Sequence, residues 1–284
     1  MAIVKHFEKT SIAEMELSSQ VVVEETTSVR ETVLAMAEAN SSCAFVMNGT
    51  EISGIFTEHD VTHRVVRSPD VWDSPVAMHM TPDPHIIDPN ASAMDALRLM
   101  RAHRFRNLPV RLGDGEFANV THYDLIALAS AFLDSESKDP AEFSAEHVLR
   151  FVDFYGMPSR VPLEVTADTT LYDTVNLMVE SDRGLVSIVD DRGVVIGEFT
   201  QHDVFRKVAC RVQDLIDEVV GEWMTTENMA TSLASAKIAD GLHEMAAKRH
   251  RYLLLVNETG RSVGIVTFRD IADYFDAAFS EVPQ

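Results

Sequence analysis

Basic side chains are scarce in this chain of 284 residues. Its 24 Lys and Arg residues face 45 Asp and Glu residues, which leaves a formal net charge of −21. A protein of that charge repels the phosphate backbone of nucleic acids and the anionic face of a membrane, unless one region concentrates its cations. We therefore expect neither a nucleic acid nor a membrane among its partners.

Cysteine is scarce as well, and long apolar runs are missing. Cys43 and Cys210 lie in no CxxC or Cys/His spacing, which argues against a disulfide framework or a structural zinc site and fits a reducing, cytoplasmic location. No apolar run approaches the roughly 18 residues of a membrane span, and Met1–Thr10 lacks the apolar core of a signal peptide. The 46% of hydrophobic residues is typical of a folded protein, here of about two domains.

One pattern is repeated four times along the chain. Each copy ends in T-x-x-D followed by an aliphatic residue, within GIFTEHDV, NVTHYDL, GEFTQHDV and GIVTFRDI. An acidic residue stands 26 or 27 positions before each threonine, at the start of a stretch whose apolar positions fall on one helix face. These acids are Glu31, Asp95, Asp173 and Asp240, and the methionines five positions later, expected in the core, are Met36, Met100, Met178 and Met245.

Two short apolar runs, separated by a turn, precede each threonine and predict a β-hairpin between two helices. A further apolar run stands before each first helix and is weakest at Met229–Thr231. The unit is therefore β-α-β-β-α, and the fold class is α/β (α+β). The glycines expected in the hairpin turns are Gly49, Gly113, Gly193 and Gly260.

The spacing of the threonines groups the units into two pairs, because neighbours lie 64 and 67 residues apart within a pair and 79 apart between pairs. The segment between the pairs has apolar residues on one helix face after Pro140, which predicts a helix that either connects the pairs or only covers the core of the second. The expected organisation is an N-terminal extension (1–16), a first pair (17–133, units about 17–68 and 76–133), a helical connector (134–160) and a second pair (161–284, units about 161–212 and 220–279).

The repeat resembles the cystathionine β-synthase (CBS) domain, whose units pair into Bateman modules. The resemblance extends over about residues 17–279 and rests on the G-h-h-T-x-x-D-h hairpin, on HRFRNLPV (103–110), and on Met-Thr before the even-numbered units at Met80-Thr81 and Met224-Thr225. Four such units without a catalytic domain are similar to the γ subunit of AMP-activated protein kinase. The resemblance thus implies two Bateman modules and a regulatory role.

The T-x-x-D motif has two physical explanations. At a strand-to-helix junction, the threonine hydroxyl and the free amides of the first helical turn can bind a phosphate oxygen, while the aspartate can accept hydrogen bonds from ribose hydroxyls. The same spacing forms a capping box, in which the acid only bonds to its own helix end. The resemblance to the family implies phosphate and ribose binding, at one to three of the four sites, by Thr57, Asp60, Thr121, Asp124, Thr200, Asp203, Thr267 and Asp270.

Two basic runs could neutralise a phosphate on this acidic protein. RAHRFR (101–106) and KRHR (248–251) stand just before the hairpins of the second and fourth units. The resemblance implies that Arg106 and Arg251 face bound phosphates, and we expect Arg104 and Arg249 to assist them. The alternative, that cations only meet the dipole of a helix C-terminus, applies best to residues 101 and 248.

His59 and His63 lie four residues apart on the expected second helix of the first unit, a spacing that can present two imidazoles to one metal. No third ligand is apparent from the sequence. We therefore expect a solvated helix face and no metal site.

These observations favour a ligand-sensing regulatory protein without enzymatic activity or catalytic cofactor. It would bind AMP, ADP or ATP between paired units and signal to an unknown effector protein by rearranging its modules. No residues remain for a fused effector domain, so we expect the effector on another chain. Two alternatives stay open: an S-adenosylmethionine sensor, whose ligand would leave the arginines unexplained, and a ligand-free scaffold or dimerisation module, with the chain a possible homodimer. A nucleotide hydrolase is disfavoured because the sequence has no P-loop, nucleophile elbow or paired-carboxylate motif.

Overall fold

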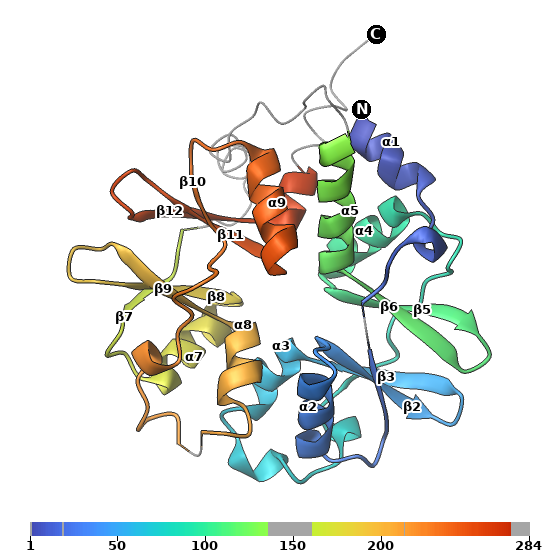
Figure 1. Cartoon of the computed structure of the whole chain (residues 1–284). Coiled ribbons are helices and arrows are strands. Elements are labelled where there is room, and N and C mark those ends of the chain that lie inside the picture. The colour runs from blue at the N-terminus through green and yellow to red at the C-terminus, as the bar shows by residue number, and fades with distance from the viewer. Residues whose placement is uncertain (1, 19, 136–160, 213, 274–284) are drawn as a thin grey trace.

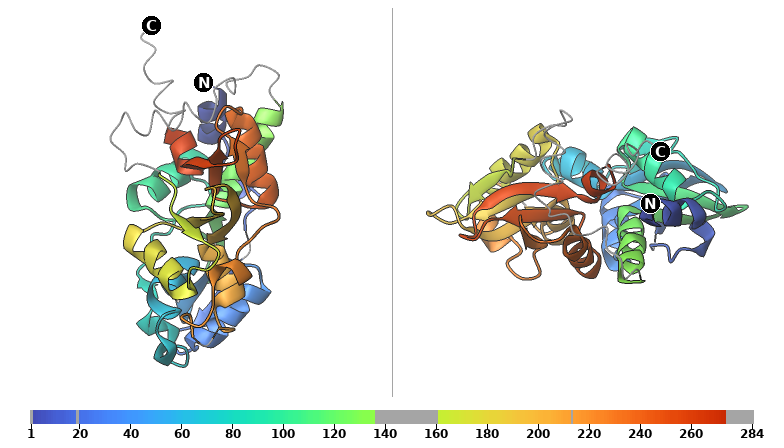
Figure 2. Two further views of the ribbon diagram at one scale, coloured as in Figure 1. Left: turned by 90° about the vertical axis from the view of Figure 1, so that its left-hand side faces the viewer. Right: turned by 90° about the horizontal axis from the view of Figure 1, so that it is seen from above.

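Four copies of the predicted unit form a flattened ring (Figures 1 and 2). The structure, a computed structural model, describes residues 2–18, 20–135, 161–212 and 214–273. Most of the expected connector, from residue 136 to residue 160, lies outside the described residues. Among the described residues no helix has the length and apolar character needed to span a membrane.

The first and third units have the predicted β-α-β-β-α order. In each, the first strand runs parallel to the second, and the second pairs with the third as an antiparallel hairpin. The last helix is short and continues as a π-helical turn. The elements of the first unit are β1 (Val21–Glu24), α2 (Val29–Glu38), β2 (Cys43–Asn48), β3 (Glu51–Thr57), α3 (Glu58–Asp60) and η2 (Val61–Val65). Those of the third unit are β7 (Glu164–Thr166), α7 (Leu171–Ser181), β8 (Leu185–Val189), β9 (Val195–Thr200), α8 (Gln201–Asp203) and η6 (Val204–Val208).

The fourth unit has the same order, with its first strand parallel to the second, whereas the second unit differs at its first strand. In the second unit this strand is reduced to one parallel bridge between Ile87 and Val110, and the short β4 (Thr81–Pro82) pairs with β3 of the first unit instead. The other elements of the second unit are α4 (Ala93–His103), β5 (Asn107–Gly113), β6 (Glu116–Thr121) and α5 (His122–Ser135). The fourth unit comprises β10 (Thr231–Leu233), α9 (Ile238–Lys248), β11 (Tyr252–Val256), β12 (Ser262–Thr267) and helical residues 268–273.

Short elements cover and connect the units. Helix α1 (Ala2–Lys9) packs on the second unit, where Ile3 and Phe7 join the core formed by α4 and α5. Four 3₁₀ turns complete the description: η1 (Ile12–Glu14), η3 (Pro69–Val71), η4 (Val76–Met78) and η7 (Val220–Glu222).

The apolar packing confirms the two Bateman modules. Phe45 of the first unit packs with Phe117 of the second, and Leu185 of the third packs with Leu254 of the fourth, so the sheets meet within each pair. Helices close the ring between pairs: α5 packs against α9, and Phe205 of the third unit enters the core of the first.

Repeated sequence positions have the same role in several units. The four methionines at the repeated position of the first helices are fully buried, as expected for core residues. Ser28, Ser92 and Thr170 cap these helices through the amide of the acidic residue three positions later. One turn glycine was wrongly predicted: Gly115, with φ +75°, occupies the left-handed turn position of the second unit, while Gly113 is the last residue of β5.

Candidate functional site

All four T-x-x-D corners form capping boxes. In chain order, the backbone N–H of each threonine donates to Oδ2 of its aspartate at 2.9, 2.6, 2.8 and 2.7 Å. The amide of each aspartate donates back to the threonine hydroxyl at 3.2 to 3.4 Å. The capping explanation of the motif therefore holds at every corner. Any role in ligand binding has to use the remaining oxygen, Oδ1, or replace these bonds.

At the first two corners, described side chains already contact Oδ1. Arg64 Nη1 lies 3.1 Å from Oδ1 of Asp60. The hydroxyl of Ser18, from the segment before the first strand, donates to Oδ1 of Asp124 at 2.7 Å. Burial raises the pKa of both carboxyl groups. Ser18 thus fills the corner of the second unit.

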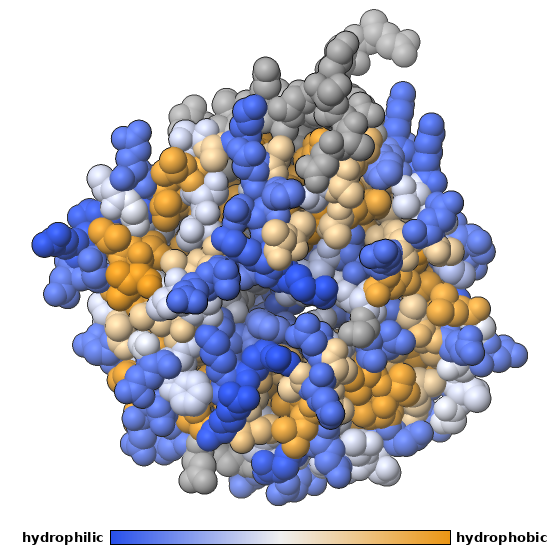
Figure 3. All heavy atoms as spheres, in the orientation of Figure 1, coloured by the Kyte–Doolittle hydropathy of each residue, from blue (hydrophilic) through white to orange (hydrophobic). Residues whose placement is uncertain are grey.

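The third corner opens into a cavity. Oδ1 of Asp203 accepts a hydrogen bond from the hydroxyl of Thr225 at 2.8 Å and lies 2.9 Å from Nζ of Lys207. Asp203 and Thr200 line a polar cavity of about 250 Å³, together with the whole basic run from Lys248 to Arg251. Figure 3 shows hydrophilic side chains around a depression near the middle of one face of the ring.

The cavity brings together a third of the residues predicted from the sequence. Thr200, Asp203, Arg249 and Arg251 line it. The other eight predicted residues are not among its lining residues: Thr57, Asp60, Thr121, Asp124, Thr267, Asp270, Arg104 and Arg106. The pairing of an odd-unit T-x-x-D corner with even-unit cations is thus seen at one place, between the third and fourth units.

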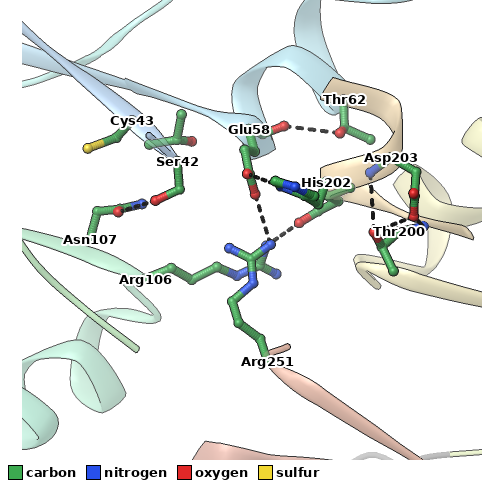
Figure 4. Close-up of polar contacts among 12 residues, drawn as sticks. Ser42, Cys43, Glu58, Thr62, Arg106, Asn107, Thr200, His202, Asp203 and Arg251 are labelled. Carbon is green, nitrogen blue, oxygen red and sulfur yellow. Dashed lines mark hydrogen bonds and ion pairs between the residues drawn. The ribbon is translucent and has the colours of Figure 1, made fainter. Parts of the chain in front are cut away.

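An ion pair across the ring borders this cavity. Nη2 of Arg251 in the fourth unit lies 3.0 Å from Oε2 of Glu58 in the first, and Nδ1 of His202 lies 2.8 Å from Oε1 of Glu58 (Figure 4). The residue exposures of Arg251 and Glu58 are 7% and 2%, so the pair is shielded from water. Burial would raise the pKa of Glu58, but the charges of Arg251 and His202 hold it below its ordinary value.

Arg106, the counterpart of Arg251 in the second unit, makes a similar contact with a neutral partner. Arg106 of the second unit donates a hydrogen bond to the side-chain oxygen of Gln201 in the third unit. Glu58 and Gln201 both directly follow the motif threonine in the sequence. Each of these arginines therefore reaches an odd unit of the opposite module, with a carboxylate at one contact and an amide at the other.

Eleven of the fifteen residues that line the cavity were not among the predicted site residues, and Glu58, Tyr123 and Glu198 are three of them. The guanidinium groups of Arg249 and Arg251 lie 5.2 and 5.5 Å from the ring centre of Tyr123, within the range of a cation–π contact. A periodicity analysis treats such a tyrosine as an ordinary helix residue. Only its position directly before the motif aspartate could have drawn attention to it.

Glu198 carries a clearer signal. It occupies the strand position where the first and fourth units have Ile55 and Ile265, so an acid interrupts an apolar pattern. Its residue exposure is 1%, and burial, with the nearby charge of Asp203, raises its pKa to about 8. Oε1 lies 3.3 Å from Nδ1 of His250, while Oε2 has no hydrogen-bond partner among the described residues. At neutral pH Glu198 is thus mainly protonated, and its carboxyl group can donate a hydrogen bond into the cavity.

The geometry and the sequence agree with one protein family. The family model of the CBS domain matches residues 12–67, 76–128, 153–210 and 220–277. The chain belongs to the CBS domain family, whose members of this kind are generally regulatory.

Two solved structures share the fold over most of the chain. Protein MJ1225 of Methanocaldococcus jannaschii, described as a proposed archaeal homologue of γ-AMPK, aligns with a TM-score of 0.75 at 18% identity and covers 97% of this chain and 100% of its own. An uncharacterised conserved protein of Pyrococcus horikoshii aligns with a TM-score of 0.57 at 18% identity and covers 93% of this chain and 97% of its own. At these identities the likeness is one of fold.

Relatives are found among eukaryotic proteins. The CBS domain-containing protein CBSCBSPB1 of Arabidopsis thaliana is 25% identical over 285 residues, which cover 90% of this chain and 52% of the relative. The meiotically up-regulated gene 70 protein of Schizosaccharomyces pombe is 32% identical over 296 residues, which cover 86% of this chain and 40% of the relative. The chain therefore spans about half, or less, of the length of these relatives.

Proposed function

We propose that this protein is a ligand-sensing regulator that binds an adenosine nucleotide in the polar cavity at the corner of the third unit, which residues of all four units line. One observation carries the proposal: a single cavity combines the corner of Thr200 and Asp203 with the basic run Lys248–Arg251. The corner suits ribose hydroxyls and the cations suit phosphate. No catalytic step is part of this function, and AMP, ADP or ATP acts as a regulatory ligand.

The contacts of the cavity suggest how the nucleotide is held. A ribose hydroxyl takes the place of the Thr225 hydroxyl on Oδ1 of Asp203, whose Oδ2 keeps its capping role. The phosphates point towards Arg249 and Arg251, where a charge-assisted hydrogen bond is stronger than a neutral one. Ligand cavities usually measure roughly 300–1,000 Å³, so a nucleotide entering about 250 Å³ has to displace contacts that close the cavity.

The ion pair between Arg251 and Glu58 is the contact that a phosphate would displace. A phosphate competes with the Glu58 carboxylate for the guanidinium of Arg251. Because this pair joins the fourth unit to the first, its loss changes the contact between the two modules. The nucleotide thereby favours one arrangement of the modules over the other, as any allosteric ligand must. An effector protein, so far unidentified, would recognise that arrangement.

Two other functions each have an observation in their favour. The carboxylate of Glu58 in the cavity favours a cationic adenosyl ligand such as S-adenosylmethionine. The capping boxes at all four corners favour a ligand-free scaffold or a homodimerisation module. We prefer the nucleotide because the positively charged side chains of Lys248, Arg249 and Arg251 line the cavity. Neither alternative accounts for these three charges.

Calorimetric titration of the purified chain with AMP, ADP, ATP, adenosine and S-adenosylmethionine separates these functions. We expect saturable binding of at least one nucleotide, tighter than that of adenosine, and no steady release of phosphate from ATP. A ligand at 100 times its Kd should also stabilise the fold by about 2.7 kcal/mol. Preference for S-adenosylmethionine would identify the first alternative, and absence of binding by all five compounds would identify the second.

A further inference from the structure

A cluster of three possible metal ligands lies away from the cavity, at a contact between the two modules. His59 and His63 belong to the helix formed by α3 and η2 in the first unit, and their rings stack with centroids 3.8 Å apart. Asp182, the C-cap of α7 in the third unit, faces both rings. Its Oδ1 lies 3.6 Å from Nε2 of His59 and 3.9 Å from Nε2 of His63. One donor atom from each residue lies within 4.8 Å of the other two.

The hydrogen bond of His63 leaves the right nitrogen for a metal. Its Nδ1 lies 3.0 Å from the backbone carbonyl oxygen of His59, and a carbonyl oxygen can only accept, so Nδ1 carries the proton. Nε2 then has a free lone pair that points towards Asp182. This atom is buried and has no hydrogen-bond partner among the described residues. Donation from the second ring nitrogen to a carbonyl is the usual support of a metal-binding histidine.

The carboxylate oxygen Oδ1 of Asp182 lies 3.6 and 3.9 Å from the two Nε2 atoms, farther than an ordinary hydrogen bond. A cation between the three atoms would stabilise this arrangement.

The spacing fits a tetrahedral ion. With metal–ligand bonds of about 2.1 Å, the donors of a tetrahedral site lie roughly 3.4 Å apart, slightly closer than the observed 3.6 and 3.9 Å. The two rings are stacked with planes 14° apart, so the rings have to turn until both Nε2 lone pairs point at one ion before the bonds can form. Two imidazoles and one carboxylate favour Zn²⁺ or a related transition metal over Mg²⁺ and Ca²⁺, which prefer oxygen ligands. Asp182 keeps 64% of its side-chain surface exposed, so an ion can enter from solvent.

We propose that His59, His63 and Asp182 bind one Zn²⁺, with water as the fourth ligand, and that this ion joins the first Bateman module to the second. The sequence led us to expect no metal because the third ligand comes from another unit, more than a hundred residues along the chain. The positive charges of Arg106 and Arg67 near the imidazoles oppose a cation, so the site is expected to bind more weakly than a closed structural zinc site. This inference does not depend on the proposed nucleotide site.

The site can be tested with Co²⁺, whose visible spectrum reports tetrahedral coordination, and with Zn²⁺ by calorimetry. We expect the chelator-treated full chain to bind one ion. Asp182→Asn should weaken binding at least about tenfold, since even the loss of an outer partner costs 10–100-fold. This variant should fold, because Asn40, in the turn that follows α2 of the first unit, has the same φ of 52°. His63→Gln should weaken binding to a similar extent.

His85→Gln provides the matched control. His85 and His103 also form a close ring pair, with centroids 4.3 Å apart, and belong to no described three-ligand cluster. The control should bind Co²⁺ as the wild type does. Equal affinity of the wild type, D182N and H63Q would overturn the proposal, and so would a wild type that binds no ion or lacks a tetrahedral Co²⁺ spectrum. Zn²⁺ should also raise the Tm of the wild type and of H85Q more than that of D182N.

Discussion

Replacement of Glu58 by glutamine should strongly destabilise the folded protein, although it changes the volume of the side chain very little. Glu58 and Arg251 are both almost fully buried and lie 3.0 Å apart, and the change leaves the arginine charge without its partner. Removing one member of a buried ion pair costs about 3–5 kcal/mol. Glutamine keeps an oxygen that can accept from Arg251, so we expect the lower end, about 3 kcal/mol.

Urea unfolding followed by circular dichroism measures this cost, and a double-mutant cycle with Arg251→Met assigns it. E58Q/R251M should be more stable than the sum of the two single changes predicts, because it leaves no buried charge unpaired. In a thermal scan, about 3 kcal/mol corresponds to a fall in Tm of roughly 6–12 °C.

The pH dependence gives a second test of the same pair. The pKa of Glu58 is held below its ordinary value of 4.5, so its contribution to stability is present above pH 4.5 and is lost as the pH falls through the lower pKa of the folded state. E58Q lacks this loss. The difference in stability between the wild type and E58Q should therefore shrink as the solution is acidified below pH 4.5.

Glu51→Gln is the control for these measurements. Glu51 and Arg111 also form a close ion pair, at 2.7 Å, but their side chains are 64% and 40% exposed. An exposed pair of this kind contributes little to stability, because water and salt screen the two charges. If E58Q costs no more than E51Q, or if the double variant E58Q/R251M is as unstable as simple addition predicts, the buried ion pair does not have the role assigned to it.

Three further predictions follow from individual positions. Arg104 has a left-handed φ of 59°, which asparagine adopts more readily than arginine. Arg104→Asn should therefore raise the free energy of unfolding, measured with urea, by about 0.5–1 kcal/mol. A decrease would contradict the assignment of backbone strain. Burial raises the pKa of Glu198 to about 8, so the folded state holds a proton that the unfolded state has lost, and wild-type stability should fall as the pH rises from about 5 to 8. Glu198→Gln should remove that slope, and an unchanged slope would show that another group titrates. Arg249→Met should weaken ATP binding about tenfold and leave adenosine binding unchanged. The tenfold loss corresponds to about 1.4 kcal/mol of binding free energy from the phosphate contact. Equal losses for both ligands in calorimetry would contradict that contact.

The repeat could be predicted from the sequence because its signals are local. Apolar periodicity, helix caps and hairpin turns each depend on residues within about ten positions of one another. The order of elements in the first, third and fourth units, the buried methionines and the pairing into two modules are therefore confirmed, whereas the first strand of the second unit is reduced to one bridge. The turn at Gly115 was missed because two glycines stand close together there, and only the backbone shows which one has a positive φ.

The site could be predicted less completely, because it depends on contacts between distant segments. Glu58 and Arg251 are separated by 193 positions, and no local pattern connects them. Ser18 lies before the repeat and yet fills the corner at Asp124. The motif alone treats its four copies as equal, whereas the packing of the ring decides that Asp203 borders the cavity.

The most direct test of the nucleotide site compares two equivalent aspartates. Asp60 and Asp203 make the same capping bonds, so replacing either by asparagine should cost similar stability, but only Asp203 lines the cavity. Calorimetric titration with the tightest-binding nucleotide should show Asp203→Asn at least about tenfold weaker than the wild type, as expected for a hydrogen bond to a charged group, and Asp60→Asn close to the wild type. Equal affinities for the two variants would show that the aspartate of the third unit only caps its helix, and would contradict the proposed site.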